Sequence, residues 1–222
     1  MEQLDEHILE SEYALKLYEK LGSEMRKESD RGALLLSAEI ASQALLDEIS
    51  RLRPAYFTQK QIDTLFDYSG FLGSLSARIH HAAFQGILLE GPYRALNILR
   101  KLRNKAAHSD SKFSLSDNTD QIKSMFDLGL GSHAALRKSS LEALLDELYS
   151  NLRALGETYD FENPFDTREK LANILQQRPQ SLEKLQNNLE KFELAVGIWI
   201  ILVGLHAQTD KIIDLRKQAS RA

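Results

Sequence analysis

The sequence contains no cysteine among its 222 residues. Disulfide bridges, thiolate nucleophiles and cysteine-ligated metal centres are therefore excluded. Proline is also rare, at four residues, and clusters of β-branched residues are few, so no segment is typical of a β-strand. A chain of this length without covalent staples must be stabilised by a hydrophobic core, and it is long enough to bury one.

Positive charge is not in excess, because 28 lysines and arginines stand against 32 aspartates and glutamates, a net charge of −4. A protein that mainly coats nucleic acid needs a broad positive field, so any anion site here must be local. The longest apolar run, 194–205, is shorter than the roughly 20 residues that span a bilayer. The acidic first ten residues are unlike a signal peptide. We expect a cytoplasmic protein without membrane contact, and a core helix at 194–205.

Apolar residues recur at spacings of three and four almost throughout the chain, which predicts an all-α multi-helix bundle. Capping residues and breakers place helices at 2–21, 29–52, 58–66, 72–88 and 92–108, followed by helices that Ser139, Asp166 and Ser181 open. The stretch 129–139, with two glycines, is expected to be irregular. It divides the predicted helical core, 1–128, from a C-terminal helical extension, 129–222, packed on the same core.

One run of residues has side chains suited to chemistry, namely Arg103, Asn104 and His108 within the predicted helix 92–108. Arginine presents a fork of donors that matches phosphate, and imidazole exchanges protons near neutral pH. The pair could process a phosphodiester without metal, with Arg103 stabilising charge on phosphorus and His108 moving a proton. Asn104 would orient one of them or the phosphate.

A helical wheel separates these side chains. Arg103 falls roughly 60° from the centre of the apolar stripe of its helix and about 140° from His108. One helix therefore does not direct both groups at one atom. They could converge through the reach of arginine, a distorted helix end, or a second copy of the helix in a symmetric homodimer.

The same helix carries further cations and no acidic residue between Gly91 and Ala107. A phosphate-bearing partner could bind this positive surface, whose candidate nucleic-acid-binding residues are Arg94, Arg100, Lys101 and Lys105. The alternative is a solvated helix face, with cations favourably placed toward the C-terminus. On that alternative Arg103 pairs with a carboxylate such as Glu39, and His108 satisfies backbone carbonyls.

Other kinds of site find no support in the sequence. His80 and His81 are adjacent and so point to different faces of a helix, and no histidine pair four residues apart with a nearby carboxylate offers a metal triad. No phosphate loop or nucleophile elbow is present. We expect neither a metal nor a cofactor.

Two blocks, "FLGSLSARI" at 71–79 and "LRKLRNKAAHS" at 99–109, together with 30–46, resemble the mannitol operon repressor family over roughly the first 120 residues. Separately, the Arg103, Asn104 and His108 spacing resembles the Arg-x4-6-His signature of HEPN domains, which are all-helical bundles to which the repressor-like proteins are related. The first resemblance implies a regulatory protein, acting through a protein partner in transcriptional repression. The sequence has no clear helix-turn-helix to read DNA.

The second resemblance implies a different activity. HEPN ribonucleases cleave RNA without metal, and they assemble the site from both copies of the motif in a homodimer. Carried over, Arg103, Asn104 and His108 would be the catalytic residues of a toxin or defence effector. We therefore expect first a regulatory protein that acts by association, and as the alternative an endoribonuclease.

Overall fold

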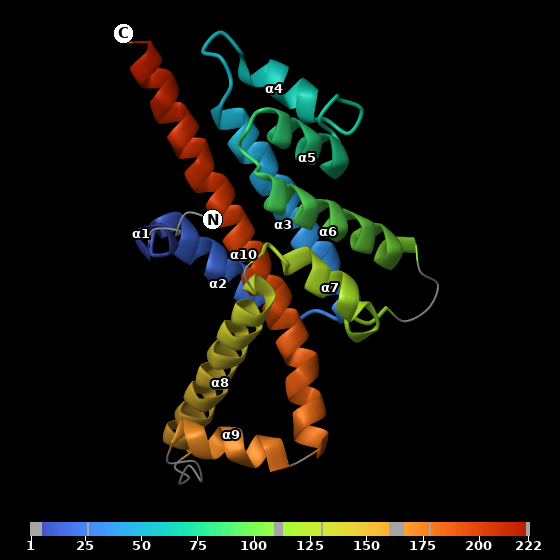
Figure 1. Ribbon diagram of the computed structural model, residues 1–222, viewed down its shortest axis with the longest axis vertical. Helices are drawn as coiled ribbons and strands as arrows, with labels where there is room; N and C mark the ends of the chain where they lie inside the picture. The colour runs from blue at the N-terminus through green and yellow to red at the C-terminus, as the bar shows by residue number, and fades with distance from the viewer. Residues whose placement is uncertain are drawn as a thin grey trace.

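The computed structural model describes residues 6–25, 27–108, 113–129, 131–159, 167–177 and 179–220. All regular elements within these ranges are helical (Figure 1), which confirms the expected all-α multi-helix bundle. The elements are α1 (Glu6–Leu9), α2 (Glu12–Met25), α3 (Asp30–Arg51), α4 (Gln59–Phe66), α5 (Leu75–Phe84), α6 (Glu90–His108), η1 (Ser116–Asn118), α7 (Thr119–Phe126), α8 (Ser132–Tyr159), α9 (Arg168–Gln177) and α10 (Pro179–Ala219).

Helix α3 lies at the centre of the bundle and contacts α2, α5, α6 and α10. It begins where the side chain of Ser29 accepts a hydrogen bond from the Gly32 backbone N–H at 3.1 Å, which satisfies one free donor of the first turn. Asp30 in that turn adds a favourable interaction with the helix dipole. Its buried leucines and alanines face helices on both sides, so α3 connects the two halves of the core.

Helix α10 carries the longest apolar run, and this run is buried. Leu194, Ile198, Leu202 and Leu205 are at most 2% exposed and pack in the same core as residues of α3 and α6. The segment Asn188–Ala219 is long and apolar enough to cross a membrane, but 56% of its most apolar window is buried inside the structure. That burial is typical of a core helix.

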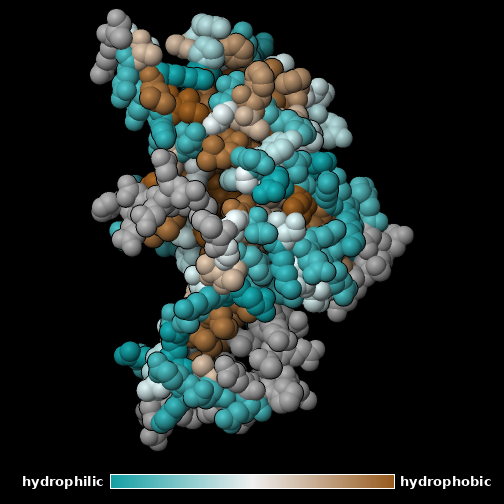
Figure 2. Space-filling model, in the orientation of Figure 1, coloured by the Kyte–Doolittle hydropathy of each residue, from teal (hydrophilic) through white to brown (hydrophobic). Residues whose placement is uncertain are grey.

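Helices α8 and α9 and the first half of α10 form a triangle at the lower end of the molecule (Figure 1). The second half of α10 then runs upward along α3 and α2. The surface in this view is largely polar, and apolar side chains gather in the recesses between helices (Figure 2). One hydrophobic core thus includes residues from both sides of the sequence boundary predicted at 129.

Several helix limits differ from the sequence-based expectation. Helix α2 continues past Gly22 to Met25, and α6 begins at Glu90 rather than near Pro92. The predicted cap at Ser139 is wrong, because Ser139 lies inside α8, which starts at Ser132. Two glycines of positive φ, Gly129 at 97° and Gly131 at 74°, make the turn instead, so the irregular stretch is shorter than expected.

Three further expectations have different outcomes. Helix α5 spans only Leu75–Phe84 rather than 72–88, because Ser74 caps it. Ser181 lies inside α10, which begins two residues earlier at Pro179. Asp166, the predicted cap of the preceding helix, lies outside the described residues.

Candidate functional site

Helix α6 presents one face to the core and the other to solvent. Ala95, Leu96, Leu99, Leu102 and Ala106 are at most 2% exposed, and their spacing is that of a single helical stripe. Packing of this stripe against α3, α5 and α7 fixes the rotation of the helix. The rotation in turn determines where each polar side chain of the motif lies.

An open groove of about 1000 Å³ lies beside α6. One wall is α3, the second is the loop between α4 and α5 with the start of α5, and the third is α6. Helix α6 contributes Arg100, Arg103 and Asn104 to the lining. The structure therefore brings together two of the three predicted catalytic residues and one predicted nucleic-acid-binding arginine.

Arg103 is exposed, and its Nη1 donates a hydrogen bond to Oδ1 of the neighbouring Asn104 at 3.2 Å. Within the described part of the chain, no carboxylate lies within ion-pair distance of it. Glu39 lines the same groove but does not pair with it. Arg100 is half-buried, and its Nε is buried with no hydrogen-bond partner. Two guanidinium groups thus border an open groove without being neutralised by direct contact.

His108 is exposed at the last residue of α6 and is not part of the groove lining. Among the described residues, no hydrogen bond engages its side chain. His108 lies four residues beyond Asn104 and so on the same side of α6, but the groove ends one turn before it. A single chain does not join the two groups at one site.

The remaining predicted cations of α6 are not in the groove. Arg94 and Lys101 are exposed elsewhere on the helix. Lys105 donates a hydrogen bond from Nζ to Oδ1 of Asn118 at 2.7 Å, which ties the end of α6 to η1. Of the four candidate nucleic-acid-binding residues, Arg100 alone lines the groove.

A buried arginine that the sequence analysis did not single out holds the second wall in place. Arg78 of α5 is 9% exposed. It donates to the Leu72 carbonyl at 2.8 Å and to the Ser42 carbonyl and hydroxyl at 3.1 and 2.8 Å. Its guanidinium also lies 5.5 Å from the centre of the Phe66 ring. Burial lowers the pKa of Arg78, and Glu39 and Asp47 oppose this effect.

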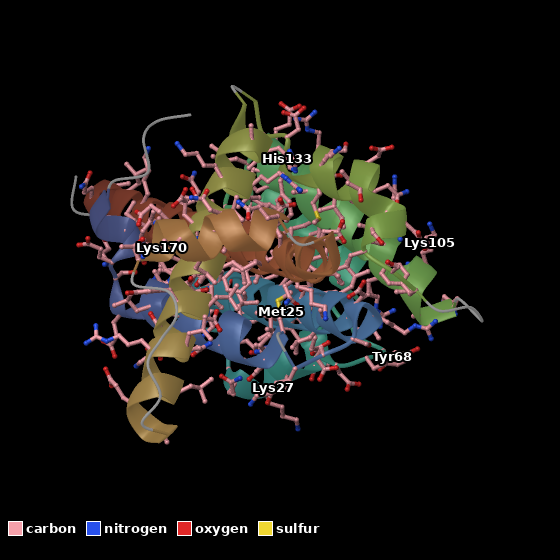
Figure 3. The ribbon with its side chains drawn as sticks, turned by 90° about the horizontal axis from the view of Figure 1, so that it is seen from below. Met25, Lys27, Tyr68, Lys105, His133 and Lys170 are labelled. Carbon is pink, nitrogen blue, oxygen red and sulfur yellow. The ribbon has the colours of Figure 1, made fainter. Side chains whose placement is uncertain are left out.

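The loop between α4 and α5 projects an aromatic side chain at the groove. The Leu72 N–H donates to the Leu65 carbonyl at 2.8 Å, and the Gly73 N–H donates to the Gly70 carbonyl at 3.0 Å, so the loop is tightly folded. Tyr68 lines the groove and is 97% exposed. Figure 3 shows Tyr68 and Lys105 at the same edge of the molecule. No sequence signal identified Tyr68, because its position depends on how the loop folds.

The composition of the groove suits an anion that carries an aromatic group. Guanidinium groups bind phosphate through several donors at once, and an exposed tyrosine offers a surface on which a base can stack. Two acidic residues, Glu28 and Glu39, also line the groove and limit its positive potential. The arrangement can therefore bind one or two phosphates locally rather than a long stretch of polyanion.

Within the described ranges, no group of three histidine, aspartate or glutamate side chains is arranged to hold a metal ion. Comparison of the chain with known protein families, characterised proteins and solved structures found no match. The function of the groove is therefore inferred from its residues and their geometry.

Proposed function

We propose that the chain is a metal-independent endoribonuclease that binds RNA at the groove beside α6. The observation that supports this most is the state of Arg103, which is exposed, borders an open groove and has no carboxylate partner among the described residues. An arginine whose role was to pair with a carboxylate of a neighbouring helix would make that ion pair. The alternative interpretation, a pair between Arg103 and Glu39, does not agree with these contacts.

The proposed reaction uses the RNA 2′-hydroxyl as the nucleophile. His108 accepts the 2′-hydroxyl proton, the 2′-oxygen attacks phosphorus, and the bond to the 5′-oxygen breaks. The 5′-oxygen takes up a proton from solvent and His108 then releases its proton to solvent, which leaves a 2′,3′-cyclic phosphate and a 5′-hydroxyl. Arg103 stabilises the charge that develops on the phosphoryl oxygens, and Asn104 orients the Arg103 guanidinium.

The reaction requires a homodimer in this proposal. Arg103 and His108 point about 140° apart on one helix, and only Arg103 lines the groove. A two-fold axis near the end of α6 would place the partner subunit's His108 at the groove beside Arg103. The oligomeric state is therefore part of the test.

The test is cleavage of mixed RNA by purified protein in excess EDTA, with the ends of the products analysed. Wild type should yield 2′,3′-cyclic phosphate ends in the presence of chelator. His108→Ala and Arg103→Ala should each lower the rate at least a hundredfold. Arg94→Ala removes an exposed cation of the same helix outside the groove and should change the rate less than threefold.

Mixing the two inactive variants tests the dimer separately. If each site takes Arg103 from one subunit and His108 from the other, mixed dimers contain one site with both residues intact and should recover part of the activity. Absence of cleavage by wild type at micromolar concentration, or wild-type rates in both His108→Ala and Arg103→Ala, would refute the nuclease proposal.

A second candidate is a mannitol-repressor-like regulatory protein that acts through a protein partner. Exposed aromatic side chains favour it, since Tyr56, Phe71 and Phe84 are 79%, 76% and 88% exposed, and aromatic residues are enriched where proteins meet. The test compares transcripts in host strains that carry Phe84→Ser or His108→Ala. Regulation by association predicts that Phe84→Ser changes the transcripts as deletion of the gene does, whereas His108→Ala does not.

A further inference from the structure

Glu39 places a carboxylate in the groove beside α6. It is exposed and lines the groove on the side of α3. Among the described residues, no hydrogen bond or ion pair engages this carboxylate. Burial lowers the pKa of Arg78, and the charge of Glu39 opposes this effect. A carboxylate repels phosphate, so a role of Glu39 in RNA binding must use its two oxygens as hydrogen-bond acceptors for another part of the nucleotide.

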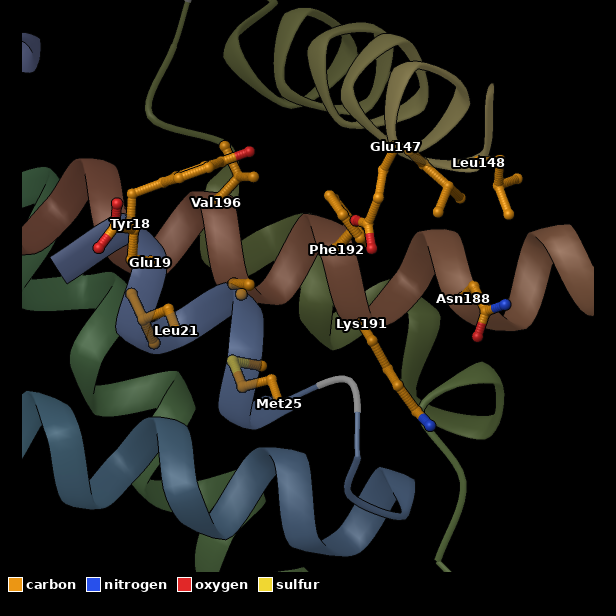
Figure 4. Close-up of a pocket in the computed structure, with 13 residues that line it drawn as sticks. Tyr18, Glu19, Leu21, Met25, Glu147, Leu148, Asn188, Lys191, Phe192 and Val196 are labelled. Carbon is orange, nitrogen blue, oxygen red and sulfur yellow. The ribbon is translucent and has the colours of Figure 1, made fainter. Parts of the chain in front are cut away.

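The second acid of the groove, Glu28, is held against the start of α3. Its carboxylate folds over Gly32, where it occupies the space that a Cβ would take. Its backbone carbonyl accepts a hydrogen bond from Nζ of Lys191 at 2.9 Å. Lys191 extends from α10 and also lines a separate cavity of about 490 Å³ between α2, α8 and α10 (Figure 4). Glu39 is therefore the acid whose oxygens remain available in the groove.

The hydrogen bonds of Arg78 tie the loop that carries Tyr68 to the turn of α3 that carries Glu39. Its guanidinium donates to the Ser42 carbonyl at 3.1 Å and to the loop carbonyl just before Gly73 at 2.8 Å. Ser42 lies three residues after Glu39 and so on the same face of α3. Gly73 packs on the backbone of Tyr68, because a Cβ at Gly73 would meet the Tyr68 carbonyl oxygen at 2.6 Å. The aromatic ring and the carboxylate therefore border the same part of the groove.

The arginines lie on the third wall. Arg100 and Arg103 line the groove from α6, and Arg103 is the group to which the proposed reaction assigns the phosphate. A nucleotide bound in this groove thus meets guanidinium groups on α6, and a ring and a carboxylate on the other two walls. This arrangement separates a place for the phosphate from a place for the base.

A carboxylate distinguishes the four bases of RNA by their Watson–Crick edges. Guanine presents two adjacent donors, its N1–H and its exocyclic amino group, which match the two oxygens of a carboxylate. Adenine and cytosine present an amino group beside a ring nitrogen that accepts, and uracil presents one N–H between two carbonyl oxygens. Those acceptors would face the carboxylate oxygens without a proton between them. Guanine is therefore the base that fits the carboxylate best, since paired bonds to a charged acceptor are strong.

We propose that the groove selects guanine, with the base stacked on Tyr68 and with its N1–H and amino group donating to Glu39. The inference rests on the proposed function, because it takes the groove to be an RNA site, and it adds that the scissile phosphate adjoins a guanosine. Glu39 determines specificity in this proposal and takes no part in bond breaking.

Titration calorimetry with the four nucleoside 3′,5′-bisphosphates tests the base site without cleavage. Wild type should bind the guanosine compound at least about tenfold more tightly than each of the other three. Glu39→Ala should abolish this preference by weakening the binding of the guanosine compound. Tyr68→Ala should weaken the binding of all four compounds roughly tenfold, because every base has a face that stacks.

Asp47→Ala is the matched control for the loss of a carboxylate. Asp47 and Glu39 are exposed residues of α3, and both oppose the lowering of the pKa of Arg78. Only Glu39 lines the groove. Asp47→Ala should therefore leave the affinities for all four bisphosphates at the wild-type values. Thermal unfolding of each variant shows whether it is folded.

Mapping of the cuts in mixed RNA separates this inference from the nuclease proposal. Cleavage beside guanosine by wild type and beside all four bases by Glu39→Ala would support the inference. A guanosine preference in binding without any cleavage in excess EDTA would support the base site and refute only the nuclease. Equal binding of the four bisphosphates by wild type, or an unchanged preference in Glu39→Ala, would overturn the inference whether or not RNA is cleaved.

Discussion

The ring of Phe126 on α7 fills the space that a side chain at Gly197 on α10 would occupy. A Cβ at Gly197 would overlap three carbons of this ring, and Phe126 is itself only 3% exposed. Gly197→Ala should therefore lower the free energy of unfolding by about 1–3 kcal/mol, as overpacking of a core does. Urea unfolding followed by Trp199 fluorescence measures the change.

Gly204 on the same helix is the matched control. A Cβ there would meet nothing within 4 Å, so Gly204→Ala should raise the free energy of unfolding by about 0.5–1 kcal/mol through helix propensity. Equal effects of the two substitutions would show that α7 and α10 are not packed as described.

The buried hydrogen bonds of Arg78 lead to a further prediction about stability. Arg78→Lys keeps the charge but cannot reach the Leu72 carbonyl and both Ser42 oxygens together. The free energy of unfolding should fall by about 2–4 kcal/mol, since buried acceptors and a buried charge lose their partners. Arg94→Lys, at an exposed position of α6, should change stability by less than about 0.5 kcal/mol. Thermal and urea unfolding measure both, and a small effect at Arg78 would contradict its role in holding the groove wall.

The capping box of α4 can be tested with two threonines. The Thr58 hydroxyl accepts from the Gln61 N–H at 3.3 Å, and the Thr58 N–H donates to Gln61 Oε1 at 2.9 Å. Thr58→Ala should lower the free energy of unfolding by about 1 kcal/mol. Thr64 lies inside the same helix with its hydroxyl bonded to the Lys60 carbonyl, so Thr64→Ala should be neutral or slightly stabilising.

The burial of Glu193 leads to a prediction of how the free energy of unfolding depends on pH. It is 2% exposed, and burial raises its pKa, although Arg137 at 2.8 Å, His133 and Lys123 act in the opposite direction. Above the ordinary value of 4.5, the folded state then binds more protons than the unfolded state. The free energy of unfolding should therefore fall as pH rises from 4.5 through the raised pKa.

Glu193→Gln should remove this part of the pH dependence and be at least as stable as wild type at pH 7. The pKa of Glu190 is also raised by burial, so a smaller slope should remain. Glu157→Gln, on an exposed ion pair with Arg153, is the control and should retain the wild-type profile. A marked loss of stability in Glu193→Gln at pH 7 would show that its pair with Arg137 outweighs the cost of burial.

Features that depend on neighbouring residues were predictable from the sequence. The apolar spacing gave the helical class, and the caps at Ser29 and at Thr58 with Gln61 form as expected. Ser139 with Glu142 has the same spacing inside α8, because residues three apart also share a face of an uninterrupted helix. The spacing alone therefore does not distinguish a cap at the start of a helix from two residues inside one.

Features that depend on distant residues were not predictable. The acceptors of Arg78 include Ser42, 36 positions away, and no local pattern marks a guanidinium as buried. The four-residue spacing of Arg100 and Asn104 puts them on one side of α6, but it could not show that α3 and the loop with Tyr68 form a groove on that side. Likewise, the alternative pairing of Arg103 with Glu39 required the packing of α3 on α6 to be known.

Lys191 connects the cavity between α2, α8 and α10 with the groove beside α6 through one hydrogen bond. It lines the cavity between α2, α8 and α10, and its Nζ holds the carbonyl of Glu28, which lines the groove beside α6. A ligand that displaced Lys191 would free a backbone carbonyl at the rim of the groove, and by thermodynamic linkage occupancy of the groove would then alter the affinity for that ligand by the same factor.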